Sequence, residues 1–240
     1  MIFYPAIDIS NGKCVRLKKG LLRHIKYYSS DPIEQSKNFK NAGCIWLHIV
    51  DIDGAFKGEP VNEKCIFKIK KESGCNIQVG GGIRSINVIE KYLENSVDRI
   101  ILGTIALIDP GFVIEACKKF PNKIAVGIDS KNNMVSTNGW AKNTNVSTEE
   151  LAQRFEDVGV SVIIFTDINK DGLLEGMNFR QIKRLTECTT TKIIASGGVS
   201  TLLDLKKLKK IKATNLEGVI AGKAIYEGKF SVKKALEILK

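Results

Sequence analysis

Short apolar runs alternate with longer amphipathic stretches along nearly the whole chain. Eight runs are rich in β-branched residues and almost continuously apolar, which is typical of parallel strands covered on both faces. These runs lie at 2–9, 45–52, 76–81, 99–103, 124–129, 162–168, 192–198 and 218–222. The stretches between them have apolar residues at helical spacing and predict helices at 32–43, 63–73, 85–96, 109–120, 147–159, 179–188, 201–212 and from Val232 onward. Eight such units predict an α/β fold, the (β/α)8 TIM barrel.

The length of the chain agrees with one barrel. Its 240 residues are close to the roughly 250 of a typical eight-fold barrel. No uninterrupted apolar run reaches the roughly 20 residues that a membrane helix needs, and the first residues lack the pattern of a signal peptide. We therefore expect a single cytoplasmic domain over residues 1–240.

Residue spacings repeat between the two halves of the chain. When the two halves are aligned, apolar runs of one half match apolar runs of the other, and several glycines also match. The matched pairs, 116 to 119 positions apart, are Asp51 with Asp167, Gly81 and Gly82 with Gly197 and Gly198, and Gly103 with Gly222. A repeat of this kind indicates a duplicated structural unit. We expect two half-barrels, at about 1–120 and 121–240.

Two aspartates end equivalent apolar runs: Asp8 ends the first and Asp129 ends the fifth. The C-terminal ends of barrel strands face the active site, and the first and fifth strands stand opposite each other in a ring of eight. One aspartate after a strand often only begins a turn, but two at equivalent places favour catalysis. The pair predicts a general acid and a general base across the barrel mouth.

Glycine clusters also come in matched pairs, after the third and fourth strands and after the seventh and eighth. Glycine lets the backbone approach a ligand closely, and N–H groups at a helix N-terminus bind anions. One cluster alone could serve only to turn a strand into a helix, but barrels commonly bind phosphate after strands seven and eight. The two clusters therefore predict two phosphate sites.

Composition adds little to this picture. Much of the formal net charge of +11 lies on solvated helix faces, because in 201–212 lysines surround a narrow apolar stripe. A positive excess also attracts a phosphorylated substrate. The six cysteines are scattered without a C-x-x-C pair, and the two histidines, His24 and His48, have no metal-ligand spacing. We expect neither a disulfide framework nor a zinc site.

Several motifs together resemble a known family. They include "PAIDISNGKCVRL", "LHIVDIDGAFKGEP", "VGGGIRS", "GIDSKNNMVSTNGW", "TDINKDGLLEGMN", "ASGGVST" and "VIAGKAIYEGKF". Over essentially the whole chain the sequence is similar to the histidine-biosynthesis isomerase family, the phosphoribosylformimino-5-aminoimidazole carboxamide ribotide isomerases. The resemblance implies an Amadori rearrangement of an aminoaldose to an aminoketose, on a substrate with a phosphate at each end. It also implies that no metal and no cofactor take part.

The resemblance also implies roles for individual residues. Asp8 is implied as the general base and Asp129 as the general acid, with Asp171 as a second candidate acid on the loop after the sixth strand. Trp140 is implied to stack on the imidazole. Thr166 is expected to point inward and hydrogen-bond near Asp129. The expected substrate-binding residues are Arg16, Gly81, Gly82, Arg84, Gly103, Thr104, Trp140, Thr166, Asp171, Gly172, Ser196, Gly197, Gly198, Gly222 and Lys223.

Two polar segments beside the proposed acids, "SKNNMVSTNGW" and "NKDGLLEGMN", are rich in glycine and asparagine. We expect both to be long loops that a ligand orders. Arg16 and Trp140 are expected in loops after the first and fifth strands. His48, inside the second strand, is expected to be a packing residue.

Three other functions compete with this interpretation. The cyclase subunit of imidazole glycerol phosphate synthase shares the duplicated halves and both aspartates, but usually has Cys-Leu-Asp at the first acid and lysine in place of Arg16. A dual-substrate isomerase would also act on phosphoribosylanthranilate. A basic nucleic-acid-binding barrel would need its lysines on one face among aromatic residues, whereas they are spread over most helices. We expect a bisphosphorylated small molecule as partner, no nucleic acid, no membrane and a monomer.

Overall fold

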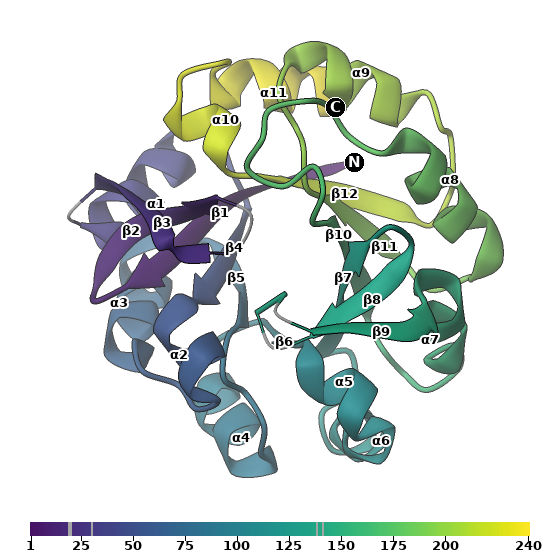
Figure 1. Cartoon of the computed structure of the whole chain (residues 1–240). Helices are drawn as coiled ribbons and strands as arrows, with labels where there is room; N and C mark the ends of the chain where they lie inside the picture. Colours follow the sequence, from purple (N-terminus) through teal and green to yellow (C-terminus); the bar gives the residue numbers. More distant parts are fainter. Residues whose placement is uncertain (19–20, 30, 138, 141) are drawn as a thin grey trace.

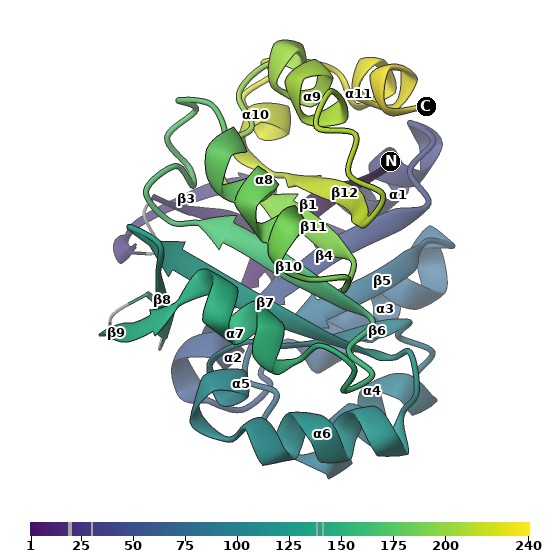
Figure 2. The same cartoon turned by 90° about the vertical axis from the view of Figure 1, so that its right-hand side faces the viewer.

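Eight parallel strands close into a barrel with helices around it (Figures 1 and 2). The computed structural model describes residues 1–18, 21–29, 31–137, 139–140 and 142–240. In order around the ring the strands are β1 (Ile2–Ser10), β4 (Trp46–Asp51), β5 (Asn76–Gly80), β6 (Arg99–Leu102), β7 (Ile124–Lys131), β10 (Val162–Asp167), β11 (Ile193–Ser196) and β12 (Leu216–Ala221). The ring is closed because β12 pairs with β1 and β7 pairs with β10. The predicted TIM barrel is confirmed.

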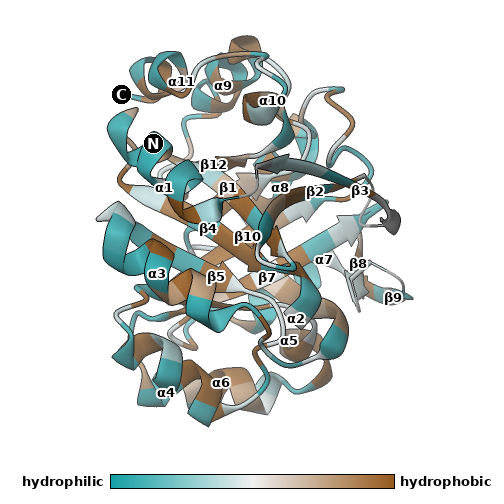
Figure 3. Cartoon of the chain, turned by 90° about the vertical axis from the view of Figure 1, so that its left-hand side faces the viewer, coloured by the Kyte–Doolittle hydropathy of each residue, from teal (hydrophilic) through white to brown (hydrophobic). Residues whose placement is uncertain are grey.

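The predicted helices form the outer layer. They are α1 (Pro32–Asn41), α3 (Glu63–Ser73), α4 (Ile86–Glu94), α6 (Pro110–Lys119), α7 (Thr148–Arg154), α8 (Phe179–Cys188), α9 (Leu202–Lys209) and α11 (Val232–Leu239). In Figure 3 the barrel strands are largely hydrophobic, whereas α1 and α3 carry mostly hydrophilic residues. In α9, Leu205 and Leu208 are buried while the lysines around them are exposed. None of the described helices is long and apolar enough to cross a membrane.

Two β-hairpins extend the barrel mouth and correct the predicted loops. β2 (Lys13–Lys18) and β3 (Leu21–Ser29) follow β1, and β8 (Met134–Thr137) and β9 (Lys142–Ser147) follow β7, all in antiparallel pairs. The prediction of a loop at Arg16 was wrong, because this residue lies on β2. The segment "SKNNMVSTNGW" is likewise mainly strand, but Trp140 lies in the turn between β8 and β9, and "NKDGLLEGMN" is a loop as predicted. Hairpin strands at a sheet rim lack the continuous apolar pattern of barrel strands.

Three short helices were also absent from the sequence prediction. They are α2 (Ile52–Lys57), α5 (Thr104–Ile108) and α10 (Lys223–Tyr226). Each begins directly or one residue after a barrel strand ends. Segments of four to six residues are too short to show a helical period.

Side chains of the barrel strands alternate between two hydrophobic clusters. On β1, Phe3 and Ile7 belong to the main core beneath the helices, whereas Tyr4 and Ala6 belong to a smaller cluster inside the barrel. Because the period of a strand is two residues, Asp8 continues the inward-facing row. Its side chain therefore points into the barrel mouth.

The matched aspartates of the two halves make matched contacts. The Asn62 side chain donates to Asp51 at 2.7 Å, and the Asn178 side chain donates to Asp167 at 2.7 Å. The two asparagines immediately precede α3 and α8, and they too are 116 positions apart. These contacts support the predicted duplication, while the half-barrel boundaries stay a prediction.

Candidate active site

A cavity of about 270 Å³ opens among the C-terminal ends of the barrel strands. The structure brings together all the residues that were predicted to be catalytic or substrate-binding, since every one of them lines this cavity. They are Asp8, Arg16, Gly81, Gly82, Arg84, Gly103, Thr104, Asp129, Trp140, Thr166, Asp171, Gly172, Ser196, Gly197, Gly198, Gly222 and Lys223. Their roles toward a substrate stay predictions.

Asp8 forms an ion pair with Arg16 at one side of the cavity. The Arg16 Nη1 atom donates to Asp8 Oδ2 at 2.6 Å, and Nη2 donates to the carbonyl of Ala6 at 2.6 Å. The guanidinium also lies 5.4 Å from the centre of the Tyr226 ring. Burial raises the pKa of Asp8, and the positive charge of Arg16 opposes that rise. The ion pair keeps the carboxylate form available in spite of burial.

Asp129 lies across the mouth on β7. Thr166 of β10 is its register partner and hydrogen-bonds to its carboxylate, as does the indole N–H of Trp140. Burial raises the pKa of Asp129, and these hydrogen bonds oppose the rise. Within the described ranges no lysine or arginine forms an ion pair with Asp129. The opposing interactions at Asp129 are therefore hydrogen bonds, whereas at Asp8 they come from a guanidinium.

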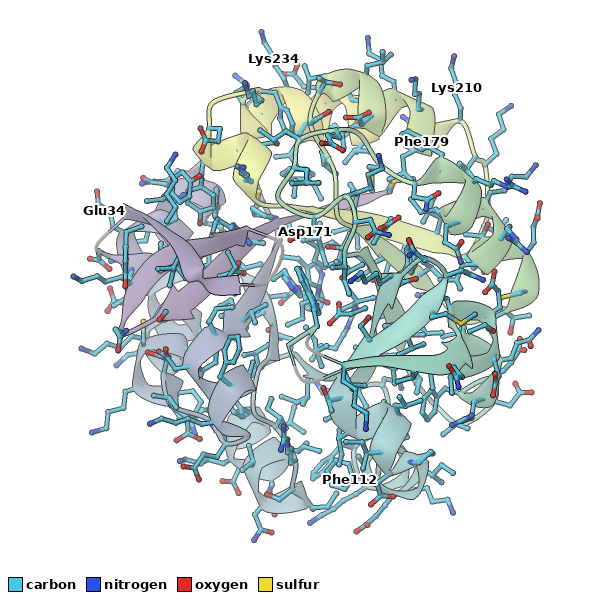
Figure 4. The ribbon with its side chains drawn as sticks, in the orientation of Figure 1. Glu34, Phe112, Asp171, Phe179, Lys210 and Lys234 are labelled. Carbon is cyan, nitrogen blue, oxygen red and sulfur yellow. The ribbon has the colours of Figure 1, made fainter. Side chains whose placement is uncertain are left out.

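Asp171 is a third carboxylate, on the loop that follows β10. Figure 4 shows it near the centre of the barrel mouth. The Nζ atom of Lys223 donates to the carbonyl of Gly172 at 2.6 Å, which ties this loop to the start of α10. Burial is the main cause that raises the pKa of Asp171 to about 6. The charge of Arg16 opposes the rise, while the charges of Asp8 and Asp129 add to it. This group titrates near neutral pH.

Two glycine-rich turns face the cavity from its two halves. Gly81 and Gly197 follow β5 and β11 with φ of 109° and 86°, a region that disfavours other residues. A Cβ at Gly81 would lie 2.2 Å from the carbonyl oxygen of Asp51, and one at Gly197 would lie 2.6 Å from that of Asp167. Only glycine lets these turns pack so closely on the neighbouring loop. Their equivalent surroundings place the two turns at equivalent points of the cavity wall.

Sequence reasoning missed several cavity residues, although they lie within the motifs quoted above. His48, predicted as packing, lines the cavity, and so do Phe56 and Leu174. The alternation on β4 was the available signal, because His48 and Val50 share the inward face. Among the described residues, no group of three or more His, Cys, Asp or Glu side chains is arranged to hold a metal ion.

Comparison with known proteins gives matches over the whole chain. The family model described as "Histidine biosynthesis protein" matches residues 2–231. A protein from Paramagnetospirillum magneticum is 46% identical over 240 residues, which is 100% of both chains. One from Rhodospirillum rubrum is 46% identical over 239 residues, 100% of this chain and 99% of the relative. One from Sinorhizobium medicae is 45% identical over 240 residues, 100% of this chain and 97% of the relative. All three are named 1-(5-phosphoribosyl)-5-((5-phosphoribosylamino)methylideneamino) imidazole-4-carboxamide isomerase.

Proposed function

Since this chain belongs to the histidine biosynthesis protein family, we propose that it catalyses the isomerisation for which its relatives are named. The reaction is an aldose-to-ketose conversion, an internal oxidation and reduction within one phosphoribosylamino group. The observation that carries the proposal is the pair of carboxylates on opposite strands, Asp8 and Asp129, which line one cavity together with both glycine turns.

Asp129 supplies the general acid in this mechanism. Its proton goes to the ribose ring oxygen as the bond from that oxygen to C1 breaks, and the nitrogen lone pair forms a protonated imine. The absence of an ion pair at Asp129 among the described residues, together with its raised pKa, supports this role. Asp171 is the second candidate for the acid, because a pKa of about 6 also leaves it partly protonated near neutral pH.

Asp8 supplies the general base. It removes the proton from C2, the electrons form the C1–C2 double bond, and the imine nitrogen is neutralised. The resulting enolamine takes the proton at C1 back from Asp8 and gives its hydroxyl proton to Asp129. Both carboxyl groups return to their starting states, and the aminoketose forms with no net change in atoms. The Arg16 ion pair supports this role because it favours the ionised form that a base requires.

The substrate's two phosphates are proposed to occupy the glycine turns. Gly82, Gly103 and Thr104 would hold one, and Gly198 with Gly222 the other. We place Trp140 on the imidazole ring, since it lines the cavity. We further propose that the protein acts as a monomer in the cytoplasm.

Direct turnover tests the proposal. The purified protein is given the aminoaldose substrate, and the aminoketose is measured with no metal or cofactor added. The same protein is given phosphoribosylanthranilate, which detects a second substrate, and the aminoketose with ammonia, which detects the cyclase reaction. No conversion of the aminoaldose would refute the proposed function.

A further inference from the structure

Three polar side chains form a row across the inside of the barrel, below the acids. His48 on β4 is the register partner of Gln78 on β5, and Gln78 is the partner of Arg99 on β6. Gln78 is fully buried and Arg99 is 8% exposed. The Gln78 Nε2 atom lies 3.1 Å from Nδ1 of His48, and Arg99 Nη1 donates to Gln78 Oε1 at 3.2 Å. The row joins the barrel interior to the cavity, because His48 lines it.

Arg99 is held from several sides. Its two terminal nitrogens donate to Glu217 Oε1 at 3.2 and 3.3 Å, and the same oxygen accepts from the Tyr4 hydroxyl at 2.7 Å. The guanidinium also lies 4.6 Å from the centre of the Trp46 ring. Glu217 is the extra residue where the pairing of β12 with β11 shifts register, and such a bulge re-aims a side chain. Arg99 therefore presents a fixed donor to Gln78.

The fixed donor sets the orientation of the Gln78 amide. A guanidinium only donates hydrogen bonds, so the amide oxygen must face Arg99 and the amide NH2 must face His48. An NH2 group cannot accept a hydrogen bond, so the Nδ1 atom of His48 must be the acceptor and carry no proton. In a neutral imidazole the proton is then on Nε2.

His48 is neutral in this environment. Burial, aided by the charge of Arg16 on β2, lowers its pKa to about 3. The charge of Arg16 disfavours a second proton on His48, and Arg99 faces it only through Gln78. Nε2, on the ring edge away from Gln78, is left as an uncharged donor. On the neighbouring strand, Asp8 stands one inward-facing position nearer the mouth.

We propose that Gln78 is a positioning residue that holds His48 as the neutral Nε2–H tautomer, so that this N–H donates to a sugar oxygen beside Asp8. The oxygen is the C2 hydroxyl, which becomes the ketone when the neighbouring proton leaves. This role rests on the isomerase function proposed above. A neutral donor serves the step better than an imidazolium, which would lower the basicity of Asp8.

Nuclear magnetic resonance on the whole protein tests the tautomer without substrate. Histidine labelled with ¹⁵N gives signals for two residues only, His24 and His48, and a His24→Gln variant assigns them. We expect His48 with a proton on Nε2 alone and no titration between about pH 5 and 8. A proton on Nδ1, or titration near the ordinary pKa of about 6.5, would overturn the proposal.

Two variants then test the positioning. Gln78→Glu presents a carboxylate to Nδ1, so this nitrogen should gain the proton, and Gln78→Leu should give a mixture of tautomers. Both should lower kcat by roughly tenfold, the value of one hydrogen bond made in the transition state, with KM little changed. Gln153→Glu, the same change at an exposed position, is the control and should alter neither quantity.

The outcomes separate this inference from the proposed function. A moved proton in Gln78→Glu with kcat unchanged overturns the sugar contact, even if the isomerase activity stands. An unchanged tautomer in both variants overturns the role of Gln78. If Gln78→Glu fails to fold, Gln78→Leu decides by the same two measurements. If the wild-type protein has no isomerase activity, the proposed function is refuted, and the sugar contact with it. The tautomer of His48 is still decided by the resonance measurement, which needs no substrate.

Discussion

At the residue scale, the three carboxylates of the barrel mouth have the same chemistry but different neighbours. Asp8 faces a guanidinium at 2.6 Å, Asp129 accepts from a hydroxyl and an indole, and Asp171 is surrounded by both charge signs. Environments that separate the pKa values of titratable groups are how acid and base roles are divided between identical side chains. The proposed division of labour follows from these neighbours.

Replacing either strand-end acid by asparagine should remove most turnover while the fold stays intact. Each change keeps the shape of the side chain and deletes one proton-transfer group, which contributes roughly 10²–10⁴-fold in rate. Steady-state kinetics on Asp8→Asn and Asp129→Asn measure the loss, and circular dichroism checks the fold. Asp157→Asn, at an exposed position, is the control. Near-normal kcat in either variant would disprove that assignment.

Asp171 should make the folded protein less stable as the pH rises. Its pKa of about 6 exceeds the unfolded value of roughly 3.9, so between these values the folded state keeps a proton that the unfolded state has lost. The contribution of Asp171 to the free energy of unfolding therefore falls from about pH 4 to pH 6, then levels off. Asp171→Asn should show a smaller fall than wild type, because only the contributions of Asp8 and Asp129 remain, and should gain about 2–3 kcal/mol over wild type at pH 7.5, with much less difference at pH 4.

Urea unfolding at pH 4 and pH 7.5 measures this difference. Glu175→Gln, on the same loop but exposed, should not reproduce it. Turnover by Asp171→Asn, measured in parallel, decides between the two candidate acids. An equal or lower stability of Asp171→Asn at pH 7.5 would contradict the raised pKa.

At the element scale, the β8–β9 hairpin carries Trp140 to the acid. The residue is partly exposed and has a φ of 73°, so it lies in a tight turn and not in the core. A ring within the cavity suits stacking on a flat ligand, and its N–H fixes the Asp129 carboxylate. The hairpin thus brings two functions to one position.

Two variants should separate those functions. Trp140→Phe keeps an aromatic face and loses the N–H, so it should lower kcat more than it raises KM. Trp140→Ala loses both and should impair binding and turnover together, while the melting temperature changes little because the ring is not part of either hydrophobic cluster. A fixed packing residue would instead cost roughly 3–5 kcal/mol when truncated. Thermal melts showing that cost, with kinetics intact, would contradict the functional role.

How far the sequence predicts each element depends on whether its pattern is local. The barrel strands were predictable because burial on both faces makes them continuously apolar, and Asp8 and Asp129 stood out as charges ending such runs. The hairpin strands were not predictable, because their pairing depends on the turn between them and on the edge of the sheet that they extend, not on a local apolar pattern. Likewise no local pattern could place Gln78 beside His48 and Arg99, since that contact exists only once three strands have taken their register.

At the scale of the whole molecule, the fold places equivalent groups on opposite sides of one mouth. Gly81 packs on the carbonyl of Asp51 as Gly197 packs on that of Asp167. Both turns contribute to the lining of the same cavity. A ligand that carries a similar group at each of its two ends would match such a site better than a ligand that carries only one such group.

The same symmetry predicts two anion sites in the protein without substrate. Soaking crystals in inorganic phosphate should place one ion beside Gly82 and Thr104 and another beside Gly198 and Lys223, because the backbone N–H groups of glycine turns can bind an anion. A cation adds to the backbone donors on each side, Lys223 at one site and Arg84 at the other, since both side chains line the cavity. Lys223→Met should weaken phosphate binding at the Lys223 site and leave binding at the Thr104 site unchanged. Each site is therefore the control for the other. Phosphate at only one turn, with the other closed by side chains, would remove the argument for a substrate with two phosphates.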